Sequence, residues 1–285
     1  MSTNLVPMSI DRLRFGTAGI PSGAEGDTAS GIEYNRKKLG LDAFELEFVR
    51  SINISKDKAP IIKEAAKVND ILLTCHGQYW VNLNAQTKTK LDNSIEMMVD
   101  AATRVYECGG WSITWHFAYL MKQDPKIVYE KVKNAAKEVI KKLKDKGINI
   151  WIRPETNGRV AQWGSLQEVI KLSQDLEMVL PCIDYSHLHA STNGKYNSYE
   201  EFCDVLTQLE KGLGKTILDN MHIQAQGVNY SEKGEKNHLN ILDSDLKYKE
   251  LVQSWKDFKI KGVVIPESPN VEKDSLLLKK TYQKL

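Results

Sequence analysis

The chain lacks the features of secreted, disulfide-stabilised and membrane-spanning proteins. Its cysteines are few and far apart, and none belongs to a Cys-x-x-Cys pair: Cys75, Cys108, Cys182 and Cys203. This spacing favours reduced thiols over a disulfide framework or a structural zinc cluster. The opening MSTNLVPMSI has no basic stretch before a long apolar run, and no run elsewhere approaches the ~20 apolar residues of a membrane span. We therefore expect a soluble, cytoplasmic protein with no membrane partner.

The net charge is also small, and glycine-rich nucleotide-binding motifs are missing from the sequence. The formal net charge is only +2, so no global basic field indicates nucleic acid, although a DNA enzyme can confine positive potential to one face. The chain contains neither Gly-x-Gly-x-x-Gly nor a P-loop, and we expect no nucleotide cofactor. Hydrophobic residues make up 41% of the sequence, which is enough for a sizeable core.

What is present is a regular alternation of strand-like and helix-like segments. Eight short β-rich runs lie at residues 13–19, 43–49, 70–76, 111–116, 148–155, 178–184, 216–222 and 262–268. Longer segments of helical period separate them, which predicts right-handed βαβ units and a parallel sheet. Eight units close into a (β/α)₈ TIM barrel, whereas a doubly wound open sheet more often has five to seven strands. Because no linker divides the chain, we predict one TIM-barrel domain over residues 1–285.

Potential metal ligands gather where these runs end. His76, His116 and His222 each end a run, as do Glu155, Asp184 and Glu267, while His187 and His189 closely follow the sixth run. The C-terminal ends of barrel strands converge on one face, where the active sites of such barrels lie. We expect His189 to be a hydrogen-bonded neighbour of the site. His238, in a predicted loop at 231–241, is either a ligand or a surface residue.

This ligand set predicts a centre with more than one ion. Imidazoles together with carboxylates suit zinc, with manganese or iron as alternatives. The candidates exceed what one ion can bind. Two ions held ~3.5–4 Å apart by a shared carboxylate would activate water for hydrolysis of a phosphoester or an amide.

The order of the motifs resembles the endonuclease IV family of apurinic/apyrimidinic endonucleases, zinc enzymes of DNA repair on a xylose isomerase-like TIM barrel. The resemblance covers nearly the whole chain and rests on these motifs: His-x-x-Tyr at 76–79, His116, Pro-Glu-Thr-Asn at 154–157, Asp-x-x-His at 184–187, His222, and Glu-Ser-Pro at 267–269. It implies a first zinc on His76 and His116, bridged by the catalytic carboxylate Glu155 to a second. The ligands that would complete the second site are Asp184, His222 and Glu267.

The same resemblance places His187 at a third zinc, where this sequence departs from the family. An ungapped comparison sets Glu235 and Asn237 at the places of an Asp-x-His pair, and asparagine is a poor substitute for imidazole. A shift of one residue would let His238 serve together with Glu235. Two or three zinc ions are therefore expected, with manganese as an alternative.

The resemblance also implies the substrate and its contacts. The reaction would be hydrolysis of the phosphodiester 5′ to an abasic site in double-stranded DNA, by a monomer. Tyr79 would contact the flipped-out lesion, and Trp80 could fill the gap left in the base stack. Arg50, Arg159 and Lys195, on loops at the barrel mouth, could meet phosphates.

Sugar isomerases and epimerases similar to xylose isomerase and tagatose epimerase are the alternative. One divalent metal would then be held by Glu155, Asp184, His222 and Glu267, and the two glutamates would act as acid and base on the sugar. This alternative leaves His76 and His116 without a role. A third possibility is a metal-bound barrel that binds damaged nucleic acid without cutting it.

Overall fold

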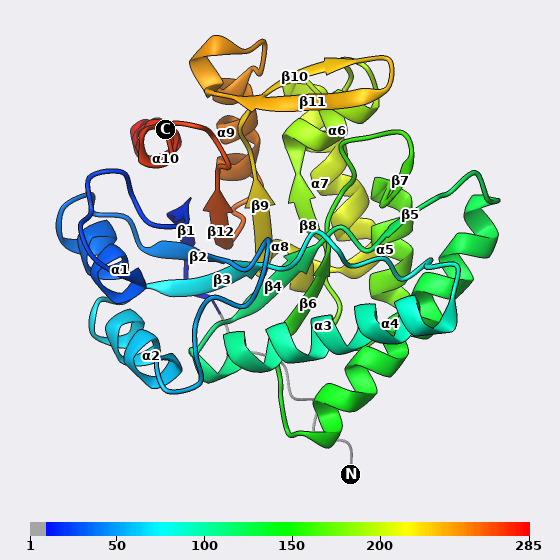
Figure 1. Ribbon diagram of the computed structural model, residues 1–285. Helices are drawn as coiled ribbons and strands as arrows, with labels where there is room; N and C mark the ends of the chain where they lie inside the picture. The colour runs from blue at the N-terminus through cyan, green and yellow to red at the C-terminus, as the bar shows by residue number, and fades with distance from the viewer. Residues whose placement is uncertain (1–9) are drawn as a thin grey trace.

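A ring of eight parallel strands forms the centre of the computed structural model, which describes residues 10–285 (Figure 1). The strands are β1 (Leu13–Ala18), β2 (Ala43–Glu47), β3 (Leu72–His76), β4 (Ser112–Trp115), β6 (Trp151–Pro154), β8 (Cys182–Asp184), β9 (Met221–Gln224) and β12 (Gly262–Ile265). Their order is β6-β4-β3-β2-β1-β12-β9-β8. The parallel bridges Ile152–Val179 and Glu155–Cys182 join the two ends. The predicted (β/α)₈ barrel is confirmed.

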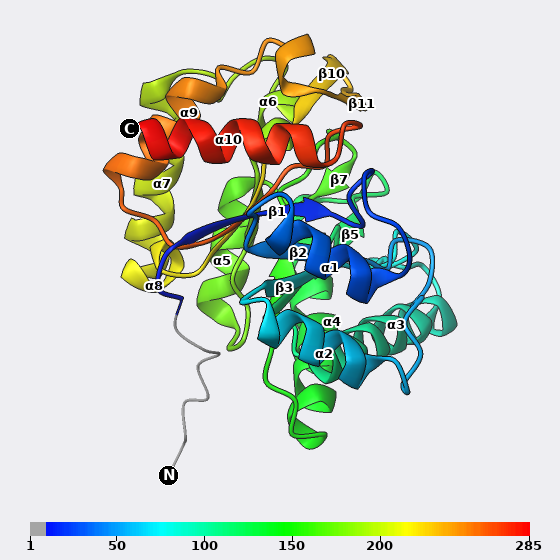
Figure 2. The ribbon, with the colours of Figure 1, turned by 90° about the vertical axis from the view of Figure 1, so that its left-hand side faces the viewer.

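Helices surround this ring, as the two views show (Figures 1 and 2). They are α1 (Thr28–Lys37), α2 (Ala59–Val68), α3 (Lys88–Glu107), α4 (Pro125–Asp145), α5 (Leu166–Asp175), α6 (Tyr185–Ser191), α7 (Tyr199–Leu213), α8 (Lys215–Leu218), α9 (Tyr248–Asp257) and α10 (Glu272–Lys284), with a 3₁₀ turn at Ile241–Asp243. None of those within residues 10–285 is long and apolar enough to cross a membrane. Residues 1–9, most of the opening MSTNLVPMSI segment, lie outside the described residues, and the domain limits 1–285 stay a prediction.

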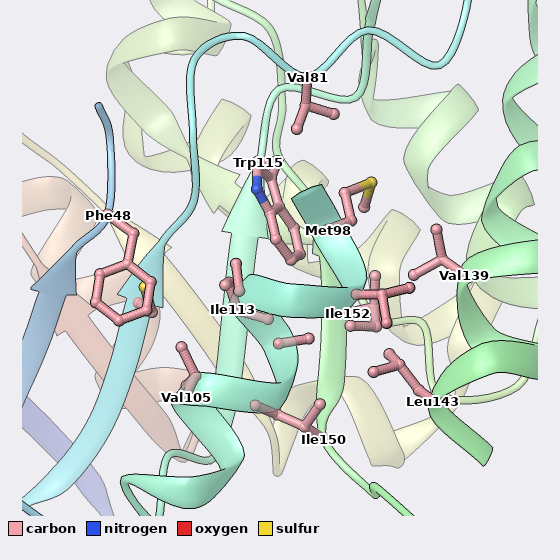
Figure 3. Close-up of a cluster of buried hydrophobic side chains, with 14 of the residues drawn as sticks. Phe48, Val81, Met98, Val105, Ile113, Trp115, Val139, Leu143, Ile150 and Ile152 are labelled. Carbon is pink, nitrogen blue, oxygen red and sulfur yellow. The ribbon is translucent and has the colours of Figure 1, made fainter. Parts of the chain in front are cut away.

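Alternation along the strands sorts side chains between the helix layer and the barrel interior. On β4 and β6, Ile113, Trp115 and Ile152 face outward and pack against Met98 of α3 and Val139 of α4 (Figure 3). Burial of each such side chain contributes about 1.5–3 kcal/mol. The intervening residues face inward, and those nearest the C-terminal strand ends are polar.

The seventh strand lies later in the chain than predicted. Residues 216–222 were expected to form it, but Lys215–Leu218 is the short helix α8 and β9 covers Met221–Gln224. A short apolar run does not distinguish a buried strand from a buried helical turn, and here Ile217 is buried from a helix. His222 is therefore the second residue of its strand, and Gln224 stands at the strand end.

The predicted loop at 231–241 was also wrong, because most of it belongs to a hairpin. β10 (Gly227–Ser231) and β11 (Gly234–Leu239) pair in antiparallel fashion, and Gly234 supplies a φ of 95° beside the turn. The hairpin packs against α6, beyond the ends of β8 and β9 in Figure 1. A second short antiparallel pair joins β5 (Ala118–Tyr119) to β7 (Gln162–Trp163).

Candidate metal centre at the strand ends

Three groups of metal-ligand side chains adjoin one another at the C-terminal end of the barrel. They are His76, His116 and Glu155; then Glu155, Asp184 and His187; then His187, Glu235 and His238. In each group, one ligand atom from every residue lies within 4.8 Å of the others. Glu155 and His187 each belong to two groups, so the three groups form one continuous series.

The first group follows from the pairing of three neighbouring strands. His76 ends β3, and His116 and Glu155 follow β4 and β6. Strand β4 pairs with β3 on one side and with β6 on the other. Glu155 Oε2 lies 3.2 Å from His76 Nε2, and Glu155 Oε1 lies 3.6 Å from His116 Nε2. His76 Nδ1 lies 2.8 Å from the Gly77 carbonyl oxygen. A proton donated there leaves Nε2 with a lone pair for a metal.

The Asp-x-x-His motif is a helix start. Asp184 ends β8 and caps α6, because its Oδ1 accepts a hydrogen bond of 2.7 Å from the His187 backbone N–H. This cap turns the His187 ring back over the strand end. Its Nδ1 lies 2.9 Å from Glu155 Oε1, and its Nε2 lies 3.6 Å from Glu235 Oε2.

A β-bulge in the hairpin assembles the third group. The register leaves Lys236 unpaired, since the residues on either side of it pair with adjacent residues of β10. An extra residue reverses the alternation of side chains. Glu235 and His238 consequently share a face, with Nε2 of the histidine 3.4 Å from the carboxylate, whereas Asn237 is exposed. The geometry accordingly fits the one-residue shift.

His222 does not join these groups. It is fully buried, with Nε2 2.9 Å from Glu45 Oε2 and Nδ1 3.1 Å from Ser112 Oγ. Glu267, after β12, stands nearer the centre: its Oε2 is 4.0 Å from His238 Nδ1. Of the four residues expected to hold the second metal, only Glu155 and Asp184 share a group within residues 10–285.

Two acidic residues of β2 went unnoticed in the sequence. Glu45 and Glu47 alternate with outward Phe44 and Leu46, so both face the barrel interior. The alternation of apolar and acidic residues in AFELE was a signal that could have located them. Burial raises the pKa of Glu47 to about 8, and the neighbouring Glu45 adds to the effect.

The carboxylates and imidazoles of the centre shift one another's pKa values. Burial alone would raise the pKa of Glu155, but His116, His187 and His76 outweigh it and hold that pKa well below its usual range. Despite the desolvation of its ring, the carboxylates Asp184 and Glu155 raise the pKa of His187 to about 10. Burial lowers the pKa of His116 to about 4.

Glu155 supplies a direct test of whether a cation fits. Both of its oxygens are buried; among residues 10–285 they have imidazole nitrogens as near as 2.9 Å, but no well-aligned hydrogen-bond donor. Buried carboxylates are normally paired or coordinate a metal. Together with imidazole nitrogens on either side, this donor set suits zinc or manganese.

The remaining predicted residues lie around the mouth. Tyr79 contacts the edge of the His76 ring, at 5.5 Å between centroids, and is 52% exposed. Trp80 is 67% exposed, and its indole N–H donates to the Arg50 carbonyl oxygen at 3.3 Å. The side chains of Arg50, Arg159 and Lys195 are exposed. His189 lies outside the three groups and hydrogen-bonds the Lys195 carbonyl and Asp245.

Comparisons with known proteins agree with this architecture. A family model described as xylose isomerase-like TIM barrel matches residues 35–283. An uncharacterized protein of Methanocaldococcus jannaschii is 37% identical over 273 residues, which are 96% of this chain and 98% of that protein.

Two solved structures resemble the fold about equally. A D-tagatose 3-epimerase-like protein has a TM-score of 0.70 at 18% identity, over 94% of this chain and 96% of that one. Endonuclease IV from Thermus thermophilus has a TM-score of 0.69 at 18% identity, over 96% and 98%. At these identities the likeness concerns the fold alone.

Proposed function

Because the chain belongs to the xylose isomerase-like TIM barrel family, we propose that it is a metal-dependent phosphodiesterase of DNA repair. Its substrate would be double-stranded DNA with an abasic site, cut on the 5′ side of the lesion. The observation that carries this proposal is the series of three ligand groups, which share Glu155 and His187. A series of this kind suits several ions acting on one phosphodiester.

The residues of each group would hold one ion, zinc in the first instance. When bound, such ions would lower the pKa of an attacking water and neutralise charge on the scissile phosphate. Glu155, ionised and shared by the first two groups, would be a ligand in both of them. The third group lies on the hairpin side. An ion held there would offset negative charge on the leaving oxygen.

The mouth offers groups that fit an interrupted base stack. The Trp80 indole is largely exposed, yet its N–H is anchored to the Arg50 carbonyl, so the ring is held in place. Stacking of a base on an aromatic ring contributes about 1–3 kcal/mol, which offsets part of the cost of extruding a nucleotide. Tyr79, the residue before Trp80, contacts the ring of the ligand His76.

A sugar epimerase or isomerase is the second candidate, favoured by the equal likeness to an epimerase-like structure. It would use one metal on Glu155, Asp184, His222 and Glu267. His222 instead contacts Glu45 and Ser112 and lies outside the three ligand groups, and the candidate gives no role to the imidazoles of His76 and His116. The observed side-chain positions therefore support it less well.

The deciding experiment is incubation of the full chain with a labelled duplex that carries one abasic site. We expect incision 5′ to the lesion in zinc or manganese, with a 3′-hydroxyl product, and no incision of the intact duplex. Chelation with EDTA should abolish the reaction, and zinc should restore it. Absence of incision, together with turnover of a ketose by the same preparation, would establish the epimerase instead.

A further inference from the structure

Two glutamines of the seventh strand region reach the carboxylates of the metal centre. Gln224 ends β9 and Gln226 follows it, and both are fully buried. Gln226 Nε2 donates to Asp184 Oδ2 at 2.7 Å, and Gln226 Oε1 accepts from the Glu267 backbone N–H at 3.3 Å. A carboxylate accepts only and a backbone N–H donates only, so these partners determine the orientation of the amide.

The backbone of Gln226 is held as well. Its N–H donates to Ser186 Oγ at 3.0 Å, and the same hydroxyl group is within hydrogen-bonding reach of the Gln226 carbonyl. One glutamine thereby connects the start of α6, the segment after β9 and the segment after β12. Asp184 caps the first of these segments, and Glu267 lies in the third.

Gln224 makes the matching contacts on the other carboxylate. Its Nε2 donates to Glu267 Oε1 at 3.1 Å and to Glu45 Oε1 at 3.3 Å, which uses both amide hydrogens. Glu45 in turn contacts His222 at 2.9 Å. Glu267 is thus connected to the buried polar layer beneath the centre.

We propose that Gln224 and Gln226 are positioning residues: Gln226 orients the ligand Asp184, and Gln224 orients Glu267, which lies outside the three ligand groups but 4.0 Å from His238 and would add a ligand beside it; this inference rests on the metal centre of the proposed function. A neutral amide suits the task, because a lysine or arginine in its place would repel the cation. Each carboxylate has about four lone-pair sites, so one bond to an amide leaves others free for a metal. Partners that orient metal ligands typically change metal affinity by about 10–100-fold.

The experiment measures zinc affinity of the full chain by titration calorimetry after removal of metal. Gln226→Met preserves length and burial but has no hydrogen-bonding amide, and we expect about 10–100-fold weaker zinc binding. Gln224→Met should weaken it in the same direction. The visible spectrum of the Co²⁺-loaded protein should also change in both variants, because carboxylate geometry at the ion changes.

Asn35→Leu is the matched control. Asn35 is a fully buried amide on α1 that donates to the Ala43 carbonyl at 2.7 Å, on the outer side of the barrel. We expect it to lower the melting temperature while zinc affinity and the Co²⁺ spectrum stay unchanged. If Gln226→Met fails to fold, Gln224→Met and Gln226→Asn, which shortens the amide, carry the same test.

The outcomes separate this inference from the proposed function. A wild-type chain that binds no zinc overturns the metal centre and the positioning role together. A wild-type chain that binds zinc, with both methionine variants within twofold of it and an unchanged Co²⁺ spectrum, overturns the positioning role alone. Incision of abasic DNA is measured separately and enters neither comparison.

Discussion

At the scale of single residues, the candidate ligands differ in how strongly we expect the incision rate to depend on them. Glu155 belongs to two of the three ligand groups, whereas His238 belongs to one and its side chain is 24% exposed. We predict that Glu155→Gln reduces single-turnover incision by more than ~100-fold, beyond what loss of an orienting partner causes. His238→Ala should reduce the rate of single-turnover incision by about tenfold. Equal losses in the two variants would show that the hairpin histidine matters as much as the bridging carboxylate.

Asp70 offers a residue-scale prediction about stability. Its carboxylate accepts hydrogen bonds of 2.9 Å from Arg12 and Arg14, which outweigh its modest burial and lower its pKa. Its φ of 48° is a conformation that asparagine tolerates. Asp70→Asn should therefore lower the free energy of unfolding by only about 1 kcal/mol, since the pair is exposed.

The sign of its pH dependence follows from the lowered pKa. A carboxylate whose folded pKa is depressed stabilises the fold above its unfolded pKa, about 3.9, and loses that contribution as the pH falls through the folded value. The difference in free energy of unfolding between wild type and Asp70→Asn should reach its full value at pH 6 and disappear toward pH 2. Urea unfolding at both pH values measures it. A difference that persists at the acidic end would assign the effect to backbone strain instead.

At the scale of elements, the bulge of β11 makes a prediction. Deleting Lys236 would give a regular hairpin in which Glu235 and His238 are two residues apart and still share a face. We expect this deletion to retain the zinc content of the wild type, measured by elemental analysis after dialysis. Inserting one glycine between Asn237 and His238 should turn the histidine outward and remove one ion. Equal loss of zinc in the two variants would mean that the bulge itself is needed.

Elements also show what could be predicted from the sequence. The alternation of runs gave the number of barrel strands and the position of each except the seventh, because strand and helix periodicity is local information. The shift of β9, which moved His222 inward and left Gln224 at the strand end, was not visible, because a short apolar run fits helix and strand alike. The pairing of His222 with Glu45 depends on contacts between strands distant in sequence. The clustering of His76 with Glu155 was predictable because barrel strand ends converge.

At the scale of the whole molecule, the barrel interior is unusually polar below the centre. Arg153 is fully buried, donates to the carbonyls of Pro181 and Asn220 at 3.0 and 2.8 Å, and stacks on Trp111 at 4.6 Å. Burial lowers its pKa to about 9. Glu45 and His222, which contact each other at 2.9 Å, are fully buried as well, and the three side chains form a polar layer under the ligands. Such layers stabilise less than apolar packing does, so we infer that this one serves the site above it.

The buried carboxylates of the centre predict that the stability of the whole fold depends on bound metal. Without cations, burial and the neighbouring Glu155 raise the pKa values of Asp184 and Glu267, so ionising these buried carboxyl groups is unfavourable in the free protein. A ligand that binds only the folded state, at 100 times its Kd, stabilises it by about 2.7 kcal/mol. For a chain of this size, calorimetry should show zinc raising Tm by about 5–10 °C relative to EDTA. Glu155→Gln, which lacks the bridging carboxylate, should show a much smaller rise, and a Tm indifferent to zinc in the wild type would contradict a metal centre altogether.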